Sequence, residues 1–242
     1  QTTPPHRRSP GRTSKPTRLQ MILDIDLVSD FVCPWCFLGK VRLDRALAEL
    51  RVSRPDLDVR VNWLPFFLNP DTPAAGEPYR EFLEAKFGGP IKAEAVLDKV
   101  RAVAADDGLV YAFERIKTRP NTLAAHRLMY RAQAQGQKPE RIQALGHALF
   151  AAHFQEGRDI GDLDTLADIA AACGERREAV REWLAGRGEL DKVKRMAEGV
   201  RRQGIEGVPF FILNRKMALS GAQSAAVLGA AILQSLETGK PS

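Results

Sequence analysis

The chain has 242 residues, of which 44% are hydrophobic, and a formal net charge of +6. This length allows one large domain or a domain with a substantial insertion, and the hydrophobic content is ample for a buried core. The sequence contains no run of about 18 apolar residues, so we expect no transmembrane helix.

The positive charge is concentrated at the start of the chain. Residues 1–20 contain five basic residues and no acidic one: Arg7, Arg8, Arg12, Lys15 and Arg18. The remainder has 36 − 5 = 31 basic against 30 acidic residues, a net charge of +1, so no nucleic-acid site is predicted there. Residues 1–20 lack the apolar stretch of a secretory signal, and we expect a flexible basic leader or tag remnant.

The first folded segment reads as strand, helix, strand. Residues 22–28 alternate as a strand, with Leu23, Ile25 and Leu27 on one face and Asp24 and Asp26 on the other. Apolar residues at helical spacing follow from about residue 34, and a proline at position 55 stops this helix. Alternating apolar residues at 59–63 then predict a second strand. This order favours a parallel pair of strands joined by a crossover helix.

The rest of the chain changes to helices and then returns to strands. The pattern predicts a hairpin over 208–213 and 217–219, followed by a final helix over 222–236. Between the two strand-containing halves, helices are predicted over 77–87, 91–106, 121–135, 139–155, 162–173, 175–185 and 190–203.

A CxxC motif, Cys33-Pro34-Trp35-Cys36, lies where the first strand gives way to the first helix. A CxxC at such a turn is typical of a redox dithiol. Pro34 at the first helical position leaves Cys33 at or next to the N-cap, where free N–H groups and the helix dipole favour the thiolate. We therefore predict that Cys33 is the exposed nucleophile. The more covered Cys36 would resolve the mixed disulfide.

The alternative interpretation of the CxxC is half of a zinc site. A closed structural zinc site needs four ligands. The other candidates, which form neither a second CxxC nor a histidine pair near another ligand, are Cys173, His6, His126, His147 and His153. The dithiol is therefore favoured, and Cys173 is expected to be a small buried apolar residue. Three cysteines do not make a disulfide framework, and a cytoplasmic location is expected.

Taken together, these motifs resemble the FrnE-like branch of the DsbA family in the thioredoxin superfamily, over residues 22 to about 236. That branch is related to kappa-class glutathione transferases and 2-hydroxychromene-2-carboxylate isomerases. The residues that carry the resemblance are Ser29-Asp30-Phe31-Val32-Cys33-Pro34-Trp35-Cys36 with Leu38-Gly39-Lys40, Pro65-Phe66-Phe67-Leu68-Asn69-Pro70, Asn121-Thr122 with Ala125-His126-Arg127, Gly157-Arg158-Asp159-Ile160, and Val208-Pro209-Phe210-Phe211 with Ser220-Gly221-Ala222-Gln223.

The resemblance implies an α/β protein with a thioredoxin-like fold and a large all-helical insertion between the βαβ and ββα halves. The expected domains are 21–76 together with 204–242 for the thioredoxin-like part and 77–203 for the insertion. It also implies that the Val208–Pro209 peptide bond is cis and faces the CxxC, with the backbone of Val208 free to pair with a substrate strand. A trans proline that opens a strand is the ordinary alternative.

Five further residues are candidates for substrate binding or proton transfer. Phe66, with Phe67 and Trp35, could line an apolar substrate groove or simply belong to the core. The resemblance places His126 near the dithiol, where it could shuttle a proton, although a histidine satisfied in the core or at the surface is the alternative. Ser220, with the N-terminus of the last helix, could hold a glutathione carboxylate or serve only as a helix cap.

We therefore predict a thiol-disulfide oxidoreductase that exchanges disulfides with protein or low-molecular-weight thiols, without a tightly bound cofactor or metal. The expected partners are a disulfide-bearing protein or small thiol and a cellular thiol reductant, with no nucleic acid and no membrane. Glutathione as a co-substrate and a homodimer stay open.

Two other functions are considered. The first is a glutathione-dependent isomerase or transferase that acts on a small aromatic substrate. Enzymes of that kind typically have serine where Cys33 stands and use bound glutathione, so the two cysteines favour dithiol chemistry. The second is a holdase-like binding protein whose helical insertion presents an apolar surface.

Overall fold

The structure is a computed structural model that describes residues 21–237; the predicted leader, residues 1–20, lies outside the described residues. Its centre is a four-stranded sheet of order β2-β1-β5-β6. Strand β1 (Met21–Ser29) pairs in parallel with β2 (Leu57–Pro65) and antiparallel with β5 (Phe210–Leu213), and β6 (Met217–Ser220) pairs antiparallel with β5. The two halves of the chain thus complete one sheet, and the predicted thioredoxin-like fold is confirmed.

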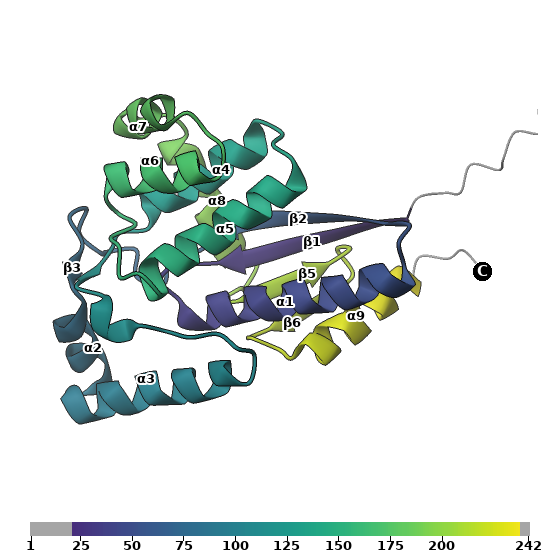
Figure 1. The fold of residues 1–242 in the computed structure, drawn as a ribbon, viewed down its shortest axis with the longest axis horizontal. Helices are drawn as coiled ribbons and strands as arrows, with labels where there is room; N and C mark the ends of the chain where they lie inside the picture. Colours follow the sequence, from purple (N-terminus) through teal and green to yellow (C-terminus); the bar gives the residue numbers. More distant parts are fainter. Residues whose placement is uncertain (1–20, 238–242) are drawn as a thin grey trace, which may run out of the picture.

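Two helices cover one face of this sheet. Helix α1 (Pro34–Ser53) and helix α9 (Ala225–Glu237) lie side by side against it (Figure 1). The predicted alternation of β1 explains the contact, because Leu23, Ile25 and Leu27 are all 0% exposed. The two aspartates between them point to the other face, where Asp26 accepts a hydrogen bond from Asn62.

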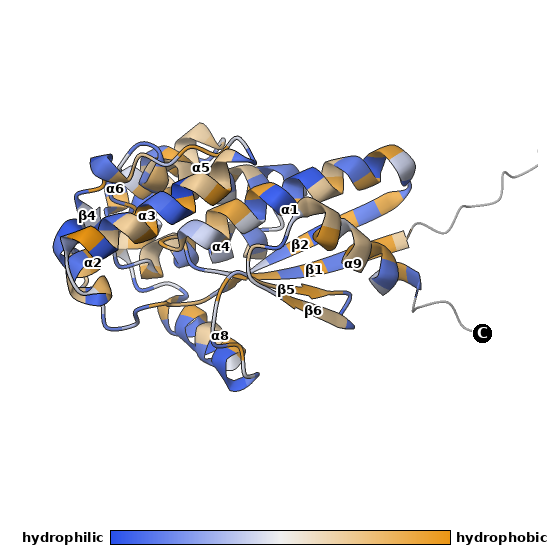
Figure 2. Cartoon of the chain, turned by 90° about the horizontal axis from the view of Figure 1, so that it is seen from below, coloured by the Kyte–Doolittle hydropathy of each residue, from blue (hydrophilic) through white to orange (hydrophobic). Residues whose placement is uncertain are grey.

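The block between β2 and β5 consists mainly of the predicted helices. No helix within residues 21–237 is both long and apolar enough to cross a membrane. Helix α8 (Leu190–Arg202) lies against β2, on the opposite side of the sheet from α1 (Figure 2). The seven helices of the block are α2 (Tyr79–Phe87), α3 (Pro90–Ala105), α4 (Leu123–Ala134), α5 (Pro139–Phe154), α6 (Leu163–Ala172), α7 (Arg177–Ala185) and α8 (Leu190–Arg202).

The block departs from the prediction in one respect, because it is not all-helical. Strands β3 (Glu77–Pro78) and β4 (Thr118–Arg119) form a small antiparallel pair, and a short 3₁₀ helix, η1, spans Phe113–Arg115. An ion pair across the strands explains the difference, since the Arg119 guanidinium donates to the Glu77 carboxylate at 3.1 Å. Helix α2 therefore begins at residue 79 rather than 77. The predicted domain boundaries stay a prediction.

Helix α5 joins the block to the sheet through close packing. The ring of Phe150 on α5 stacks on Phe37 of α1 with centroids 5.1 Å apart. A Cβ atom added at Gly146 would lie 2.3 Å from Trp63 of β2, so the α5 backbone rests directly on that indole. The hydrophobic core consequently runs without interruption from the sheet into the block.

One histidine of α5 is fully buried in this core. His153 is 0% exposed, and within the described residues neither of its ring nitrogens has a hydrogen-bond partner. Burial lowers the pKa of His153 to about 4, because the charged imidazolium would lose its hydration. The folded protein therefore holds a neutral histidine at physiological pH.

The free energy of unfolding should depend on pH through His153. The unfolded chain binds a proton at this histidine below about pH 6.5, whereas the folded chain does so only below about pH 4. The neutral histidine therefore contributes its full share to the free energy of unfolding above pH 6.5. This contribution should be lost, by roughly 3 kcal/mol, as the pH drops towards 4. Urea unfolding between pH 4 and 8 should show that His153→Leu removes most of this slope. Replacement of the exposed His147 should leave most of the pH dependence in place. An equal slope in the wild type and in both variants would contradict the assignment of this pH dependence to His153.

Candidate active site

The CxxC motif lies at the N-terminus of α1, as its sequence predicts. Helix α1 begins at Pro34, and Cys33 is its N-cap residue in an extended conformation. The preceding turn is closed by the Cys33 N–H, which donates to the Asp30 carbonyl at 3.0 Å. The N-terminus of α1, which is the positive end of the helix dipole, therefore lies at the Cys33 side chain.

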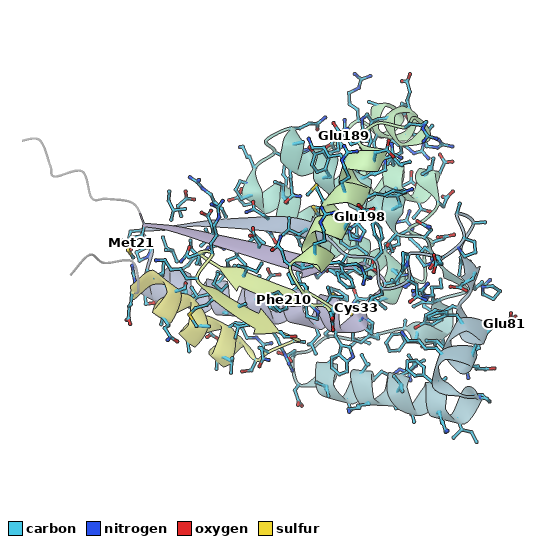
Figure 3. The ribbon with its side chains drawn as sticks, turned by 180° about the vertical axis from the view of Figure 1, so that it is seen from behind. Met21, Cys33, Glu81, Glu189, Glu198 and Phe210 are labelled. Carbon is cyan, nitrogen blue, oxygen red and sulfur yellow. The ribbon has the colours of Figure 1, made fainter. Side chains whose placement is uncertain are left out.

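The proline loop before β5 lies directly on this turn. The Cys33 thiol donates to the Val208 carbonyl with 3.7 Å between sulfur and oxygen, and the Val208–Pro209 peptide bond is cis. Figure 3 shows Cys33 beside Phe210, at the end of the sheet opposite Met21. The fold thus brings together two motifs that stand 175 residues apart in the sequence.

The two cysteines differ in exposure less than predicted. Both are free thiols in this structure. Cys33 is only 4% exposed and Cys36 is 0% exposed, so the prediction that Cys33 is exposed is wrong, although it is the more accessible of the two. The proline loop explains why Cys33 is less exposed than predicted, because the Val208 carbonyl covers its sulfur.

The environment of Cys36 keeps it protonated. The pKa of Cys36 is raised well above its usual value, chiefly by burial and then by the hydrogen bond and negative charge of Cys33. The nearby Asp30 backbone and Ser29 side chain act in the opposite direction, because they favour the thiolate of Cys36. Cys36 therefore becomes a nucleophile only when its proton is removed.

Gly39 allows the proline loop to approach α1. A Cβ atom at this position would lie 2.9 Å from Pro209 Cγ and 3.2 Å from Phe211 Cζ. Both distances are shorter than normal contacts between carbon atoms. The glycine is therefore required by the close packing of the loop on the helix, a role that the motif alone does not reveal.

A buried acid and histidine lie behind the dithiol turn. The Asp30 carboxylate accepts the Leu68 N–H at 2.9 Å and faces His126 Nε2 at 3.3 Å. Both side chains are almost fully buried, and the edge of Phe67 packs on the imidazole. His126 thus contacts the dithiol turn through Asp30, and no hydrogen bond joins it to either cysteine within the described residues.

A hollow opens next to the dithiol. It has a volume of about 330 Å³, and its wall includes Val32, which directly precedes Cys33, together with Asp30 and Phe67. The block contributes polar and charged side chains to the wall, among them Arg119, Asn121 and Glu198. A small ligand or a substrate side chain could therefore reach the neighbourhood of the Cys33 sulfur from this side.

Two predicted substrate-binding residues need correction. Phe66 is 1% exposed and packs in a small core cluster with Val28, Val200 and Ile205, so it does not line the hollow. The next residue, Phe67, does line it, because successive side chains of an extended segment point to opposite sides.

Ser220 is not at a helix N-terminus. It is the last residue of β6, opposite Phe210, and α9 begins five residues later at Ala225. The residue that caps α9 is Ser224, whose hydroxyl accepts the Val227 N–H at 3.2 Å. Both interpretations of Ser220, as a helix cap and as part of an anion site on that helix, are therefore wrong.

Tyr111 contacts the CxxC motif, and no sequence pattern predicted this contact. It lies between α3 and η1, and its hydroxyl donates to the Pro34 carbonyl at 2.6 Å. The CxxC motif thus receives a hydrogen bond from the inserted block. Among residues 21–237, no group of three or more histidine, cysteine or acidic side chains is placed to hold a metal ion.

Comparisons with known proteins agree with this arrangement. The family described as the DSBA-like thioredoxin domain matches residues 24–233. A crystal structure of a probable DsbA oxidoreductase from Streptomyces coelicolor is 32% identical, with a TM-score of 0.77, and the match covers 91% of this chain and 92% of that one.

Two other matches are more distant. The protein YwbO of Bacillus subtilis (strain 168) is 28% identical over 195 residues, which are 80% of this chain and 88% of YwbO. A structure of a 2-hydroxychromene-2-carboxylate isomerase is 16% identical with a TM-score of 0.64, over 87% of this chain and 95% of that one. At that identity the isomerase shows a likeness of fold alone.

The contact between Gly39 and the proline loop predicts a stability effect. Gly39→Ala should lower the free energy of unfolding by about 1–3 kcal/mol, because the added methyl group must displace Pro209. Urea unfolding measures this change. Gly229→Ala in α9 is the matched control, since apart from the backbone of its own helix and its chain neighbours no described atom lies within 4 Å of its added Cβ. The control should be neutral or stabilised by up to about 1 kcal/mol, and equal effects of the two substitutions would contradict the contact.

Proposed function

The chain belongs to the family of DSBA-like thioredoxin domains, and on that basis we propose that it is a thiol-disulfide oxidoreductase whose redox dithiol is Cys33 and Cys36. The observation that carries the proposal is the contact between the Cys33 sulfur and the Val208 carbonyl at the N-terminus of α1. It puts a cysteine at a helix N-terminus beside a backbone segment that can pair with an extended substrate. The cysteine pair therefore has both a nucleophile and a place for its partner.

The first step of the exchange uses Cys33. Its thiolate attacks one sulfur of a partner disulfide, which forms a mixed disulfide and releases the other partner sulfur as a thiolate. The positive end of the α1 dipole would favour the Cys33 thiolate before the attack. In the reverse direction, a substrate thiolate attacks the oxidised Cys33–Cys36 pair at Cys33.

The second step uses Cys36. Its thiol loses a proton and the thiolate attacks the Cys33 sulfur, which releases the second partner thiolate and leaves a Cys33–Cys36 disulfide. Two electrons have then passed to the partner. The negative charge of Cys33 contributes to the raised pKa of Cys36, and this charge disappears in the mixed disulfide. Cys36 is consequently easier to deprotonate when its attack is required.

Val208 and Pro209 would position the partner. We propose that the backbone of Val208 pairs with the chain that carries the disulfide, and that the hollow beside Val32 accepts a side chain or a small thiol. A disulfide-bearing protein or a small thiol would be the substrate, and a cellular thiol reductant would recycle the site. We place this activity in the cytoplasm.

Insulin reduction tests the roles of the cysteines. The wild type should reduce insulin with dithiothreitol as electron donor, and Cys33→Ser should lose this activity because the attacking thiolate is gone. Cys173→Ser is the matched control, since this thiol lies at the end of α6 and outside the site; it should retain full activity. Insulin reduction retained by Cys33→Ser would refute the proposed role.

The reduction potential tests the influence of Trp35. Disulfide oxidoreductases range from about −270 mV for thioredoxin to about −120 mV for DsbA. Trp35 carries no positive charge that would stabilise the thiolate, so we expect a value in the lower, less oxidising half of this range. Equilibration with glutathione buffers, followed by mass measurement of the trapped thiols, gives the value. A potential near that of DsbA would contradict this expectation.

The same variants separate the alternative activity. A glutathione-dependent isomerase or transferase would turn over a small aromatic substrate only with glutathione. Its activity would be retained in Cys36→Ala. The proposed exchange reaction instead requires both cysteines for release of the partner.

A further inference from the structure

Tyr111 connects the inserted block to the dithiol motif. It is 4% exposed, and its hydroxyl donates to the Pro34 carbonyl at 2.6 Å. The ring is fixed on both sides, since it stacks on Phe113 at 4.9 Å and meets the ring of Phe154 edge-on at 5.3 Å. The hydroxyl is therefore held at one point on the first turn of α1.

The accepting carbonyl belongs to a peptide group that matters for Cys33. Pro34 C=O and Trp35 N–H are the two ends of one peptide group. Pro34 has no N–H, and the N–H groups of Cys36 and Phe37 donate to the Cys33 carbonyl. Trp35 N–H is thus the remaining first-turn amide that can donate to the Cys33 thiolate.

A donor on this carbonyl strengthens that amide. The tyrosine hydroxyl supplies such a donor from outside the helix, while the Leu38 N–H acts on the tyrosine oxygen. Hydrogen bonds in a chain polarise one another by about 10–30% per bond. A donor at the carbonyl end of the peptide group therefore makes its N–H end a better donor to a negative sulfur.

The hydroxyl remains a donor throughout the working pH range. Burial raises the pKa of Tyr111 well above its usual value, and the charges of Cys33 and Cys36 raise it further. The Leu38 backbone and the Arg42 charge lower this pKa, but their effects are smaller than those that raise it. Tyr111 is thus a neutral donor whenever the Cys33 thiolate forms.

We propose that Tyr111 is a positioning residue that increases the thiolate fraction of Cys33 through the Pro34–Trp35 peptide group. The inference rests on the proposed function, and it assigns to the inserted block a part in setting the redox properties of the site. Tyr111 touches neither the substrate nor the reacting sulfurs in this account; it acts through the backbone of α1.

Tyr111→Phe tests the hydroxyl alone, because it keeps the ring. The rate of Cys33 alkylation by iodoacetamide should fall about two- to fourfold at a pH where Cys33 is partly ionised. The rates of the variant and the wild type should converge at high pH, where Cys33 is fully ionised. Mass spectrometry of the labelled peptide identifies Cys33, and the dithiol of the variant should be less oxidising in a glutathione titration.

Tyr79→Phe is the matched control. Tyr79 is also a buried tyrosine of the inserted block whose pKa is raised by burial, but it lies on α2 and packs on His153. Its alkylation profile and potential should equal those of the wild type. Thermal unfolding of both variants shows whether the loss of a buried hydroxyl destabilises them.

Three results would overturn the inference. The first is a Tyr111→Phe variant that melts at a lower temperature but keeps the alkylation profile and the potential, which would mean a purely structural role. The second is an equal change in Tyr79→Phe. The third is alkylation that slows equally at every pH, which would indicate access rather than ionisation. Failure of the proposed function looks different, because the wild type itself would then form no Cys33–Cys36 disulfide at any glutathione ratio.

Discussion

The contact between the Cys33 sulfur and the Val208 carbonyl is the constraint on which the site depends. It joins the start of α1 to the loop before β5, and the antiparallel pairing of Val28 with Phe210 holds both segments at one end of the sheet. The backbone of α1 can come this close because Gly39 has no side chain in the way. The redox chemistry that we propose needs this juxtaposition, since a dithiol without a neighbouring backbone has no means to orient its partner.

The inserted block contributes to the site as well as covering it. Tyr111 donates to the CxxC backbone, and His126 contacts Asp30 beneath the turn. Both side chains are buried, so their polar atoms must be satisfied inside the protein. Phe150 and Phe37 tie the block to α1 through stacked rings. The environment of the sulfurs is thus shared between the sheet-containing halves and the block, and a change in the block would reach the dithiol through these contacts.

Much of this arrangement could be predicted from the sequence because it follows from local patterns. The alternation of residues 22–28 specifies a strand with one buried face, and Pro34 after Cys33 specifies a helix start at the dithiol. The helices of the block begin and end within a few residues of their predicted limits, since glycine, proline and aspartate separate their apolar stripes. The family resemblance joined the two halves, which no local pattern could do.

The wrong predictions concern residues whose positions are set by tertiary contacts rather than by the local sequence. Phe66 and Phe67 are adjacent and chemically equal, and which of them enters the core depends on the path of the chain after β2. Ser220 and Ser224 are both plausible caps, but the pairing of β6 with β5 continues through Ser220 and delays the helix. Tyr111 lies outside any regular helix or strand, so no periodic pattern marks it.

A structure of a trapped intermediate tests the central claim most directly. Cys36→Ala should retain a disulfide-bearing peptide as a stable mixed disulfide on Cys33, because the resolving thiol is gone. A crystal structure of this adduct should show the peptide backbone paired with Val208, beside the N-terminus of α1. An adduct that forms at Cys173 instead, or a peptide that leaves Cys33 away from the proline loop, would contradict the account.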